Sequence, residues 1–487
     1  MTELDRRTFL KTSAAVAAGN AVAGGPFIGL TASSAQASGH HDDHRRHHHA
    51  PGYGPLSPQP DLLDGITRLS LPAGFSYRSF ALTGSTTDDG AVLPKKPDGM
   101  GAFHGRDGRT VLLRNHEIGN SAALLGAPGS ASDHDAATGG GVVGLEVTAH
   151  GHLERSWVAM NGTLSNCAAG STPWGTLLSN EESVNGPDVG NDFTGSDNAK
   201  LTAKHGYLYE VPSDGGAPNG PITHAGRFAH EGSVIDPRDG TVYMTEDDFA
   251  FPSGFYHYRS PVDPRRSGRI RDGGRLQMLK VVGQPNRDFT GHVENGSRFA
   301  TMWVDIDDPD PTFAPGTTNN EAIRAVADQG LEQGACFFSR LEGAVWSHGA
   351  VWFTSTQGGM FHGVSKGGLG QGEGQVWAYE PRSGMLTMVY ESPGPDVLDM
   401  PDNIGVSKHG AFILCEDGND TTQYLRGLTA SGTIFDFAMN ITRRDAKEEF
   451  AGAVWSQNGH TLFVNLQMSN DPARTFAIWG LWQRGAF

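Results

Sequence analysis

A short unit that recurs along this chain limits the possible folds more than any other feature of the sequence. Each copy starts with an acidic or small residue and, in most copies, a glycine or asparagine. Two apolar runs separated by a glycine-containing turn follow, and the end is polar or acidic. The copies lie at residues 98–117, 167–182, 230–247, 341–356, 401–417 and 451–465, the second being less regular. Six repeats of this kind predict a six-bladed β-propeller with insertions between the blades.

The composition agrees with an all-β fold. The 487 residues include 67 glycines and 27 prolines, so many connections are expected to be tight turns and few long helices are expected. From about Leu71 onward, short runs of β-branched, aromatic and leucine residues are bounded by Gly, Pro, Asn and Asp. We therefore expect one propeller domain over residues 66–487.

Acidic residues recur at two places in the unit. The inner strands of a propeller converge on its axis, so side chains at the same place in each repeat are expected to face one central channel. The first place holds Asp98, Glu231, Glu342 and Asp402, and the second holds Glu117, Glu182, Glu246 and Glu416. Carboxylates this close repel one another unless cations neutralise them, so the pattern favours metal binding. The alternative is that these acids lie in surface turns.

One copy carries a thiol in place of an acid. Cys167 lies in a turn of Gly, Ala and Ser residues, and a short apolar strand then leads to Glu181 and Glu182. A thiolate suits iron or zinc, whereas calcium prefers oxygen ligands, so a thiol among carboxylates suggests a transition metal, with a harder cation beside it. The alternative is that Cys167 is a small buried hydrophobe. Cys336 and Cys415 are expected to be buried, and an odd number of cysteines argues against a disulfide framework.

The N-terminus predicts export. Arg6 and Arg7 precede Phe-Leu-Lys, a weakly apolar run and the small-residue site Ala35-Gln36-Ala37, which together predict a twin-arginine signal peptide over residues 1–37. The run contains Gly and Asn and is too weakly hydrophobic for a spanning helix, so no stable membrane anchor is expected. Residues 38–65, rich in histidine, predict a disordered linker. The twin-arginine translocase is the expected export partner, and the destination is the periplasm or the medium.

Charge and patterning exclude other partners. The formal net charge of −17 leaves no basic surface that could release counterions from DNA or RNA, so nucleic acid is not an expected partner. Acidic side chains instead suit cations. The sequence shows no heptad repeat or exposed helical pattern, so we expect a monomer.

In combination, several short motifs identify a resemblance that covers nearly all of the chain from about Leu71. They are RNHE at 114–117, NCAAG at 166–170, TPWGT at 172–176, EE at 181–182, HE at 230–231, RLEG at 340–343, PDN at 401–403, CEDG at 415–418 and FAGA at 450–453. With the twin-arginine signal, this set resembles the PhoX family of secreted alkaline phosphatases. Each motif is weak by itself and specific only with the others.

The resemblance implies a six-bladed propeller whose channel holds two ferric ions and calcium ions. It implies hydrolysis of phosphate monoesters by a metal-bound oxygen nucleophile. Carried over to this sequence, Cys167, Glu231 and Glu342 would bind iron, and Arg340 would hold the substrate phosphate. The candidates for calcium or shared ligation would be Glu182, Glu117, Asp402 and Glu416.

The chemistry of the residues agrees with this reading. A planar guanidinium can bind two phosphate oxygens at once, and clustered metals allow phosphoryl transfer without a protein nucleophile. The sequence contains neither Gly-x-Ser-x-Gly nor a phosphate-binding Gly-Lys-Ser/Thr loop. Two alternatives remain: a non-catalytic calcium-binding propeller, and a calcium-dependent esterase or lactonase. A purely structural calcium site would need neither Cys167 nor Arg340.

Overall fold

The structure, a computed structural model, describes residues 52–487 except 121–122, 128, 364, 419–421, 443–447 and 469–471. The described part is built mainly from β-strands, as the sequence predicted. The signal peptide predicted at residues 1–37 and the first half of the predicted linker, residues 38–51, lie outside the described residues.

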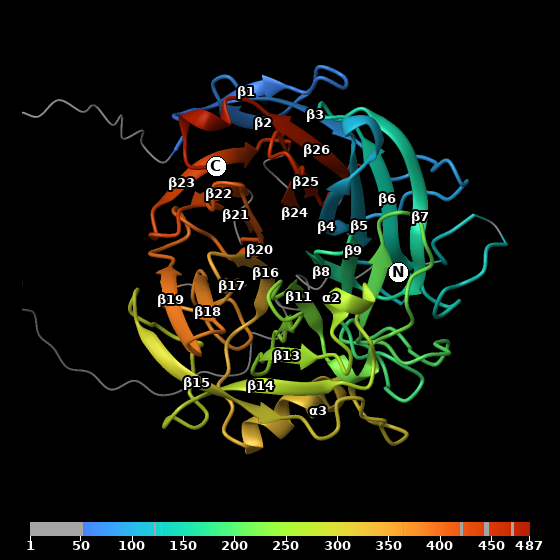
Figure 1. Cartoon of the computed structure of the whole chain (residues 1–487), viewed down its shortest axis with the longest axis vertical. Coiled ribbons are helices and arrows are strands. Elements are labelled where there is room, and N and C mark those ends of the chain that lie inside the picture. Colours follow the sequence, from blue (N-terminus) through green and yellow to red (C-terminus); the bar gives the residue numbers. More distant parts are fainter. Residues whose placement is uncertain are drawn as a thin grey trace, which may run out of the picture.

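Six strands of the described part form a closed ring around the centre of the molecule (Figure 1). Each strand packs against the next, and the last packs against the first. In order around the ring they are β4 (Pro97–His104), β8 (Asn166–Ser171), β11 (His230–Ile235), β16 (Leu341–Ser347), β20 (Pro401–Val406) and β24 (Phe450–Trp455). These strands begin the six repeats found in the sequence, so the ring brings the repeats to one axis.

Antiparallel sheets extend outward from the ring. The first is β4 with β5 (Thr110–His116), β6 (Gly140–Val147) and β7 (Leu153–Thr163), and the second is β8 with β9 (Thr176–Glu181) and β10 (Leu208–Pro212). Another joins β24, β25 (Thr461–Leu466), β26 (Arg474–Trp479) and β3 (Ser76–Phe80). A further sheet runs from β20 through β21 (Phe412–Glu416), β22 (Tyr424–Leu428) and β23 (Ile434–Asn440) to β2 (Thr67–Pro72) and β1 (Leu56–Pro60).

The remaining sheet is larger because two ring strands belong to it. From β11 it continues through β12 (Val242–Glu246), β13 (Phe255–Arg259), β14 (Arg275–Val281), β15 (Arg298–Asp305), β19 (Met385–Glu391), β18 (Gln375–Glu380) and β17 (Ala350–Ser355) to β16. Strand β15 pairs with both β14 and β19 and so joins two blade-like units at their outer edges. The described residues therefore form five sheets, and the predicted count of six blades depends on dividing this one at β15. That count stays a prediction.

Helices are few and lie outside the ring. Helix α3 (Asn319–Glu332) packs against β14, and it begins with a capping box in which the Thr318 and Glu321 side chains satisfy each other's backbone N–H groups. The other helical turns are α2 (Pro264–Ser267), η2 (Arg106–Gly108), η3 (Thr223–Ala225) and η4 (Trp482–Arg484). Within the described residues, no helix has the length and apolar character needed to cross a membrane.

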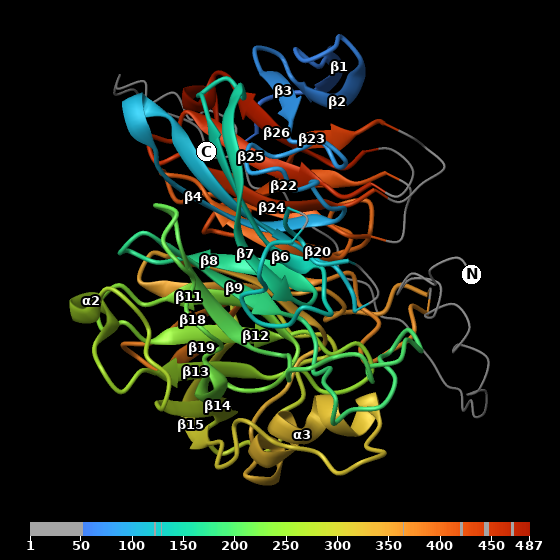
Figure 2. The same ribbon diagram turned by 90° about the vertical axis from the view of Figure 1, so that its right-hand side faces the viewer.

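The first strands of the described chain complete sheets at its other end. In Figures 1 and 2 the blue strands lie beside the red ones; β3 pairs with β26, and β2 pairs with β23. Strand β1 pairs with β2, and Asp61 after it is buried and accepts hydrogen bonds from the backbone N–H and hydroxyl of Ser79. The disordered linker predicted for residues 38–65 was therefore too long. Folded structure begins before residue 66 because β1 pairs with β2, which in turn pairs with β23 near the C-terminus.

The inner strands approach one another so closely that glycine is required between them. A Cβ atom on Gly232 would lie 2.6 Å from the Ala344 nitrogen and from the Glu342 oxygen, both backbone atoms of the next strand. Gly99 and Gly343 meet the backbone of their next neighbours at similar distances. The glycine that follows the acid in the repeat therefore sets the radius of the ring.

We predict that Gly232→Ala destabilises the protein by about 1–3 kcal/mol, because the added methyl group pushes two inner strands apart. Gly220→Ala is the matched control, because an added Cβ there meets nothing within 4 Å, and we expect a change within about 0.5 kcal/mol. Urea unfolding curves of both variants would measure the difference. Equal curves would show that the ring tolerates a wider spacing.

Candidate metal centre

The same irregularity in each inner strand turns one side chain toward the channel. The pairing of each ring strand with its neighbour in the sheet skips two residues near the strand's start, as in a β-bulge. The first skipped residues are Asp98, Cys167, Glu231, Glu342 and Asp402, whereas in β24 the skip falls one residue later in the repeat, at Gly452. In β4, β11 and β16 the second skipped residue is glycine, which allows the close approach described above.

These residues gather into three overlapping clusters. In each cluster the possible ligand atoms all lie within 4.8 Å of one another. The clusters are Asp98–Glu117–Cys167, Cys167–Glu182–Glu231 and Glu231–Glu342–Asp402. The structure thus brings together Cys167, Glu231, Glu342, Glu182, Glu117 and Asp402, six of the seven residues proposed as ligands from the sequence. Asp98 was recognised in the repeat but was left out of the proposed ligands.

A second set of residues fixes the backbone of the cluster residues from an adjacent strand outside the ring. Asn115 on β5 donates to the Cys167 carbonyl at 2.6 Å, and Thr354 on β17 donates to the Asp402 carbonyl at 2.6 Å. The same position holds Asn180, Thr245 and Asn465, which donate to the carbonyls of Glu231, Glu342 and Asp98. Four of these five residues are therefore anchored by a neighbouring sheet, and Glu342 is anchored by another strand of its own nine-stranded sheet. The sequence analysis missed this pattern, although an Asn or Thr stands two residues before the end of most repeats.

The donor set fits metal ions better than it fits hydrogen bonding alone. The Cys167 thiol lies 3.1 Å from Glu182 Oε2, and Ala168 N donates to Glu231 Oε1 at 3.2 Å. Glu231 Oε2 is buried and has no hydrogen-bond partner among the described residues. A buried carboxylate oxygen without a partner costs free energy, and a cation would satisfy it. A thiol among carboxylates is a donor set that suits a transition metal.

The pKa values of these side chains also favour bound cations. Burial first, then the charges of Glu182 and Glu231, raise the pKa of the Cys167 thiol well above its usual value. Burial and neighbouring acids also raise the pKa of Asp98, Glu231 and Glu342, and burial followed by Asp417 raises that of Asp402 to about 7. Burial first, and then the neighbouring charges, therefore favour the protonated form of each of these groups. Bound cations would instead favour the deprotonated thiolate and carboxylates, because these side chains bind metal in the deprotonated form.

Arg340 stands at the edge of the clusters. Its guanidinium donates to both oxygens of Asp247 at 3.1 and 3.0 Å and to Glu342 Oε1 at 2.7 Å. Its backbone lies in the left-handed region with φ of 47°, a conformation that costs a non-glycine residue about 1 kcal/mol and is often found at functional sites. Asp247, which orients Arg340, was missed from the sequence because Glu246 beside it was assigned to the channel.

The structure does not bring Glu416 into any cluster. Glu416 Oε1 accepts from Arg426 Nε at 2.7 Å and from Asp399 N, and its Oε2 accepts from Tyr424 N. Glu246 is likewise bound inside its sheet, by Tyr256 and Gly254. Side chains alternate between the two faces of a strand, so an error of one residue moves a side chain from the channel into the sheet. The residues after them, Asp247 and Asp417, hold the place that Glu117 and Glu182 hold in their repeats.

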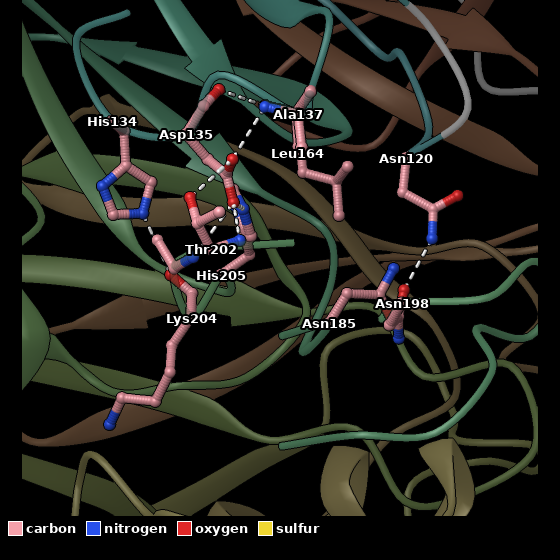
Figure 3. A network of polar contacts seen from close by, with 12 residues as sticks. Asn120, His134, Asp135, Ala137, Leu164, Asn185, Asn198, Thr202, Lys204 and His205 are labelled. Carbon is pink, nitrogen blue, oxygen red and sulfur yellow. Dashed lines mark hydrogen bonds and ion pairs between the residues drawn. The ribbon is translucent and has the colours of Figure 1, made fainter. Parts of the chain in front are cut away.

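A buried network supports β9 from behind. His205 Nδ1 lies 2.7 Å from Glu181 Oε1, and its Nε2 lies 3.5 Å from Asp135 Oδ2. Figure 3 shows Asp135 bound to the backbone N–H groups of Ala137 and Thr202, with His205 beside it. Burial would lower the pKa of His205, but Glu181 and Asp135 outweigh burial and raise it to about 9. The imidazolium therefore fixes Glu181, next to Glu182 in the channel.

The chain is similar to proteins of known family and structure. A family model described as alkaline phosphatase PhoX matches residues 51–154 and 147–470, and a model of the twin-arginine signal sequence matches residues 3–23. No curated protein matches the chain. The structure of Pseudomonas fluorescens PhoX in complex with vanadate, a transition state analogue, is similar: TM-score 0.62, 17% identity, covering 90% of this chain and 99% of that one. A Dyadobacter fermentans protein of unknown function has a TM-score of only 0.44 and 8% identity, and the match covers 83% of this chain and 99% of that one.

The fold and the channel define an exported propeller-type protein with an acid- and thiol-lined centre that could hold metal ions. Since the family model spans most of the chain, the protein belongs to the PhoX family of alkaline phosphatases, and it is an enzyme of the phosphatase class. Its signal sequence directs it across the membrane to the periplasm or the extracellular space.

We predict that His205→Gln lowers stability in a pH-dependent way. The pKa of His205 rises from 6.5 to about 9 on folding, so its contribution is complete below pH 6.5 and is lost as the pH rises through about 9. The variant should be less stable than the natural protein by about 3 kcal/mol near neutral pH, and the gap should shrink above pH 9.

Thermal unfolding followed by circular dichroism on both sides of this pH range would measure the gap. His257→Gln is the control, because burial lowers the pKa of His257 to about 4 and the ring stays neutral throughout. A gap for His205→Gln that does not change with pH would show that His205 is also neutral in the folded protein.

Proposed function

We propose that this chain is a metal-dependent alkaline phosphatase that hydrolyses phosphate monoesters in the channel of the ring. The observation that carries the proposal is the convergence of Cys167, six carboxylates and Arg340 at one end of the inner strands. The membership of the chain in the PhoX family supports it, as does the vanadate complex of the Pseudomonas fluorescens relative. We further propose that the enzyme acts as a monomer after export.

The metals that best suit these donors are iron and calcium. We propose that two ferric ions lie near Cys167, Glu231 and Glu342, because a thiolate with carboxylates favours a transition metal. Glu117, Glu182 and Asp402, together with Asp98, provide the oxygen ligands that calcium prefers. Bound cations would supply Lewis-acid stabilisation of the negative phosphoryl oxygens. The clusters share Cys167 and Glu231, so they would hold neighbouring cations.

Arg340 is suited to position the phosphate. A guanidinium presents its donors in a planar fork that matches phosphate oxygens and supports the charge that builds during transfer. Asp247 binds two of its nitrogens, Nε and Nη2, and so fixes the plane of the fork beside Glu342. The side chain is 9% exposed, so little water competes for it. In this role Arg340 orients the substrate and Asp247 orients Arg340.

The first test is hydrolysis of p-nitrophenyl phosphate at alkaline pH by the mature exported protein. We expect activity with calcium, loss of activity after a calcium chelator, and recovery when calcium returns, because the oxygen ligands repel one another without cations. A folded protein that retains iron but has no activity would point to another substrate. A folded protein with neither iron nor activity would contradict the proposal and leave a binding propeller.

We predict that Cys167→Ala removes bound iron and lowers phosphatase activity at least about 10²-fold, since loss of a direct ligand should cost as much as loss of its supporting partners. Cys336→Ala is the matched control: Cys336 is equally buried but donates to the Leu279 carbonyl in an apolar core. Elemental analysis and p-nitrophenyl phosphate turnover would be measured on both. Full activity in the Cys167 variant would favour a calcium-only hydrolase instead.

A further inference from the structure

A cleft of about 450 Å³ lies between the two units of the nine-stranded sheet, away from the channel. Its walls come from the β11–β12 turn, β12, β13, β15, β18 and the turn after β18. Glu231 stands at the start of β11 and Asp236, in the wall, follows its end. Since a strand rises about 3.3 Å per residue, roughly 17 Å separate the two. None of the cluster residues described above lines the cleft.

One wall of the cleft is aromatic and held rigidly. The rings of His257 and Trp303 stack with centroids 3.9 Å apart, and Trp303 meets Tyr379 edge to face at 5.4 Å. Trp303 Nε1 donates to the Tyr379 hydroxyl at 3.1 Å, and Tyr243 lies 5.7 Å from Tyr379. His257, Tyr243 and Tyr379 are buried and hold the partly exposed Trp303 in place, so Trp303 offers a preformed surface to another ring.

The charges of the cleft differ from those of the rest of the molecule. Three arginines and two aspartates line it, in a chain whose net charge is −17. Arg238 is already bound to both oxygens of Asp236 and lies over the ring of Trp346. Arg259 and Arg382 are exposed, and neither has an ion pair within the described part of the chain. The one remaining acid, Asp239, accepts a hydrogen bond from Thr241 N.

A ligand that uses both features must carry a flat ring and a negative charge. Guanidinium groups bind carboxylate, sulfonate and phosphate oxygens through two parallel hydrogen bonds, and they stack on rings. The volume lies in the range of sites for small organic ligands. We propose that this cleft binds a small aromatic anion, with its ring against the exposed part of Trp303 and its anionic group held by Arg259 and Arg382.

The probe for the test is p-toluenesulfonate, which carries a ring and an anion but no phosphoester bond that a phosphatase could cleave. Titrated calorimetrically into the mature protein with its metals, it should bind saturably with a millimolar or tighter dissociation constant. Methanesulfonate lacks the ring and benzyl alcohol lacks the charge, so each should bind at least roughly tenfold more weakly if both features contribute.

The variant Arg259→Ala/Arg382→Ala should bind the probe at least about tenfold more weakly and keep full phosphatase activity. Arg271→Ala, an exposed arginine outside the cleft, should change neither property. Absence of saturable binding, or equal binding by the double variant, would overturn the proposal. Loss of probe binding in Cys167→Ala but not in the double variant would place the probe in the channel and also overturn it. None of these outcomes depends on whether the channel hydrolyses phosphate esters.

Discussion

Mutual repulsion among buried acids is the constraint on which the centre of this protein depends. Six carboxylates and a thiol converge where the inner strands begin, and the nearby cations described here are Arg340 and Lys96, which pairs with Glu117. Two cations cannot neutralise so many acids at this spacing, and the raised pKa values of Asp98, Glu231 and Glu342 express the imbalance. Bound metal ions would remove this repulsion.

The bulge in each inner strand turns a sequence repeat into a site. Because the ladder skips two residues, the first side chain leaves the plane of the sheet and the second residue faces the backbone of the next strand. The bulge therefore accounts for both features of the repeat: an acid or thiol at the first skipped position and a small residue at the second. Glu231 with Gly232 and Glu342 with Gly343 meet both, and Asn180 and Thr245 then fix the backbone of the two acids from adjacent strands.

The sequence was sufficient to predict the ring and most of the residues that gather at its centre, since acids recurred with the apolar strands in register. It placed the second acid one residue early at Glu246 and Glu416, because two adjacent acids end those strands and the hydrophobic pattern does not say which faces the channel. Pairing of β3 with β26 was not foreseeable, since no local pattern marks partners separated by about four hundred residues. Strand β1 was missed inside a predicted linker because its partner β2 is itself held by β23, far along the chain.

Cations bound in the clusters would also link the inner strands to one another. Each cluster takes ligands from neighbouring sheets, so bound cations would tie β4 to β8, β8 to β11, and β11 to β16 and β20. Strand β24 contributes no residue to these clusters and would have no such tie. Hydrogen bonds replace it: Asn403 Oδ1 accepts from Gly452 N at 3.0 Å, and Asn465 Nδ2 donates to the Asp98 carbonyl at 2.5 Å. The last sheet is also the one that β3 completes, so this part of the ring closes through the backbone and amide side chains whether or not metal is bound.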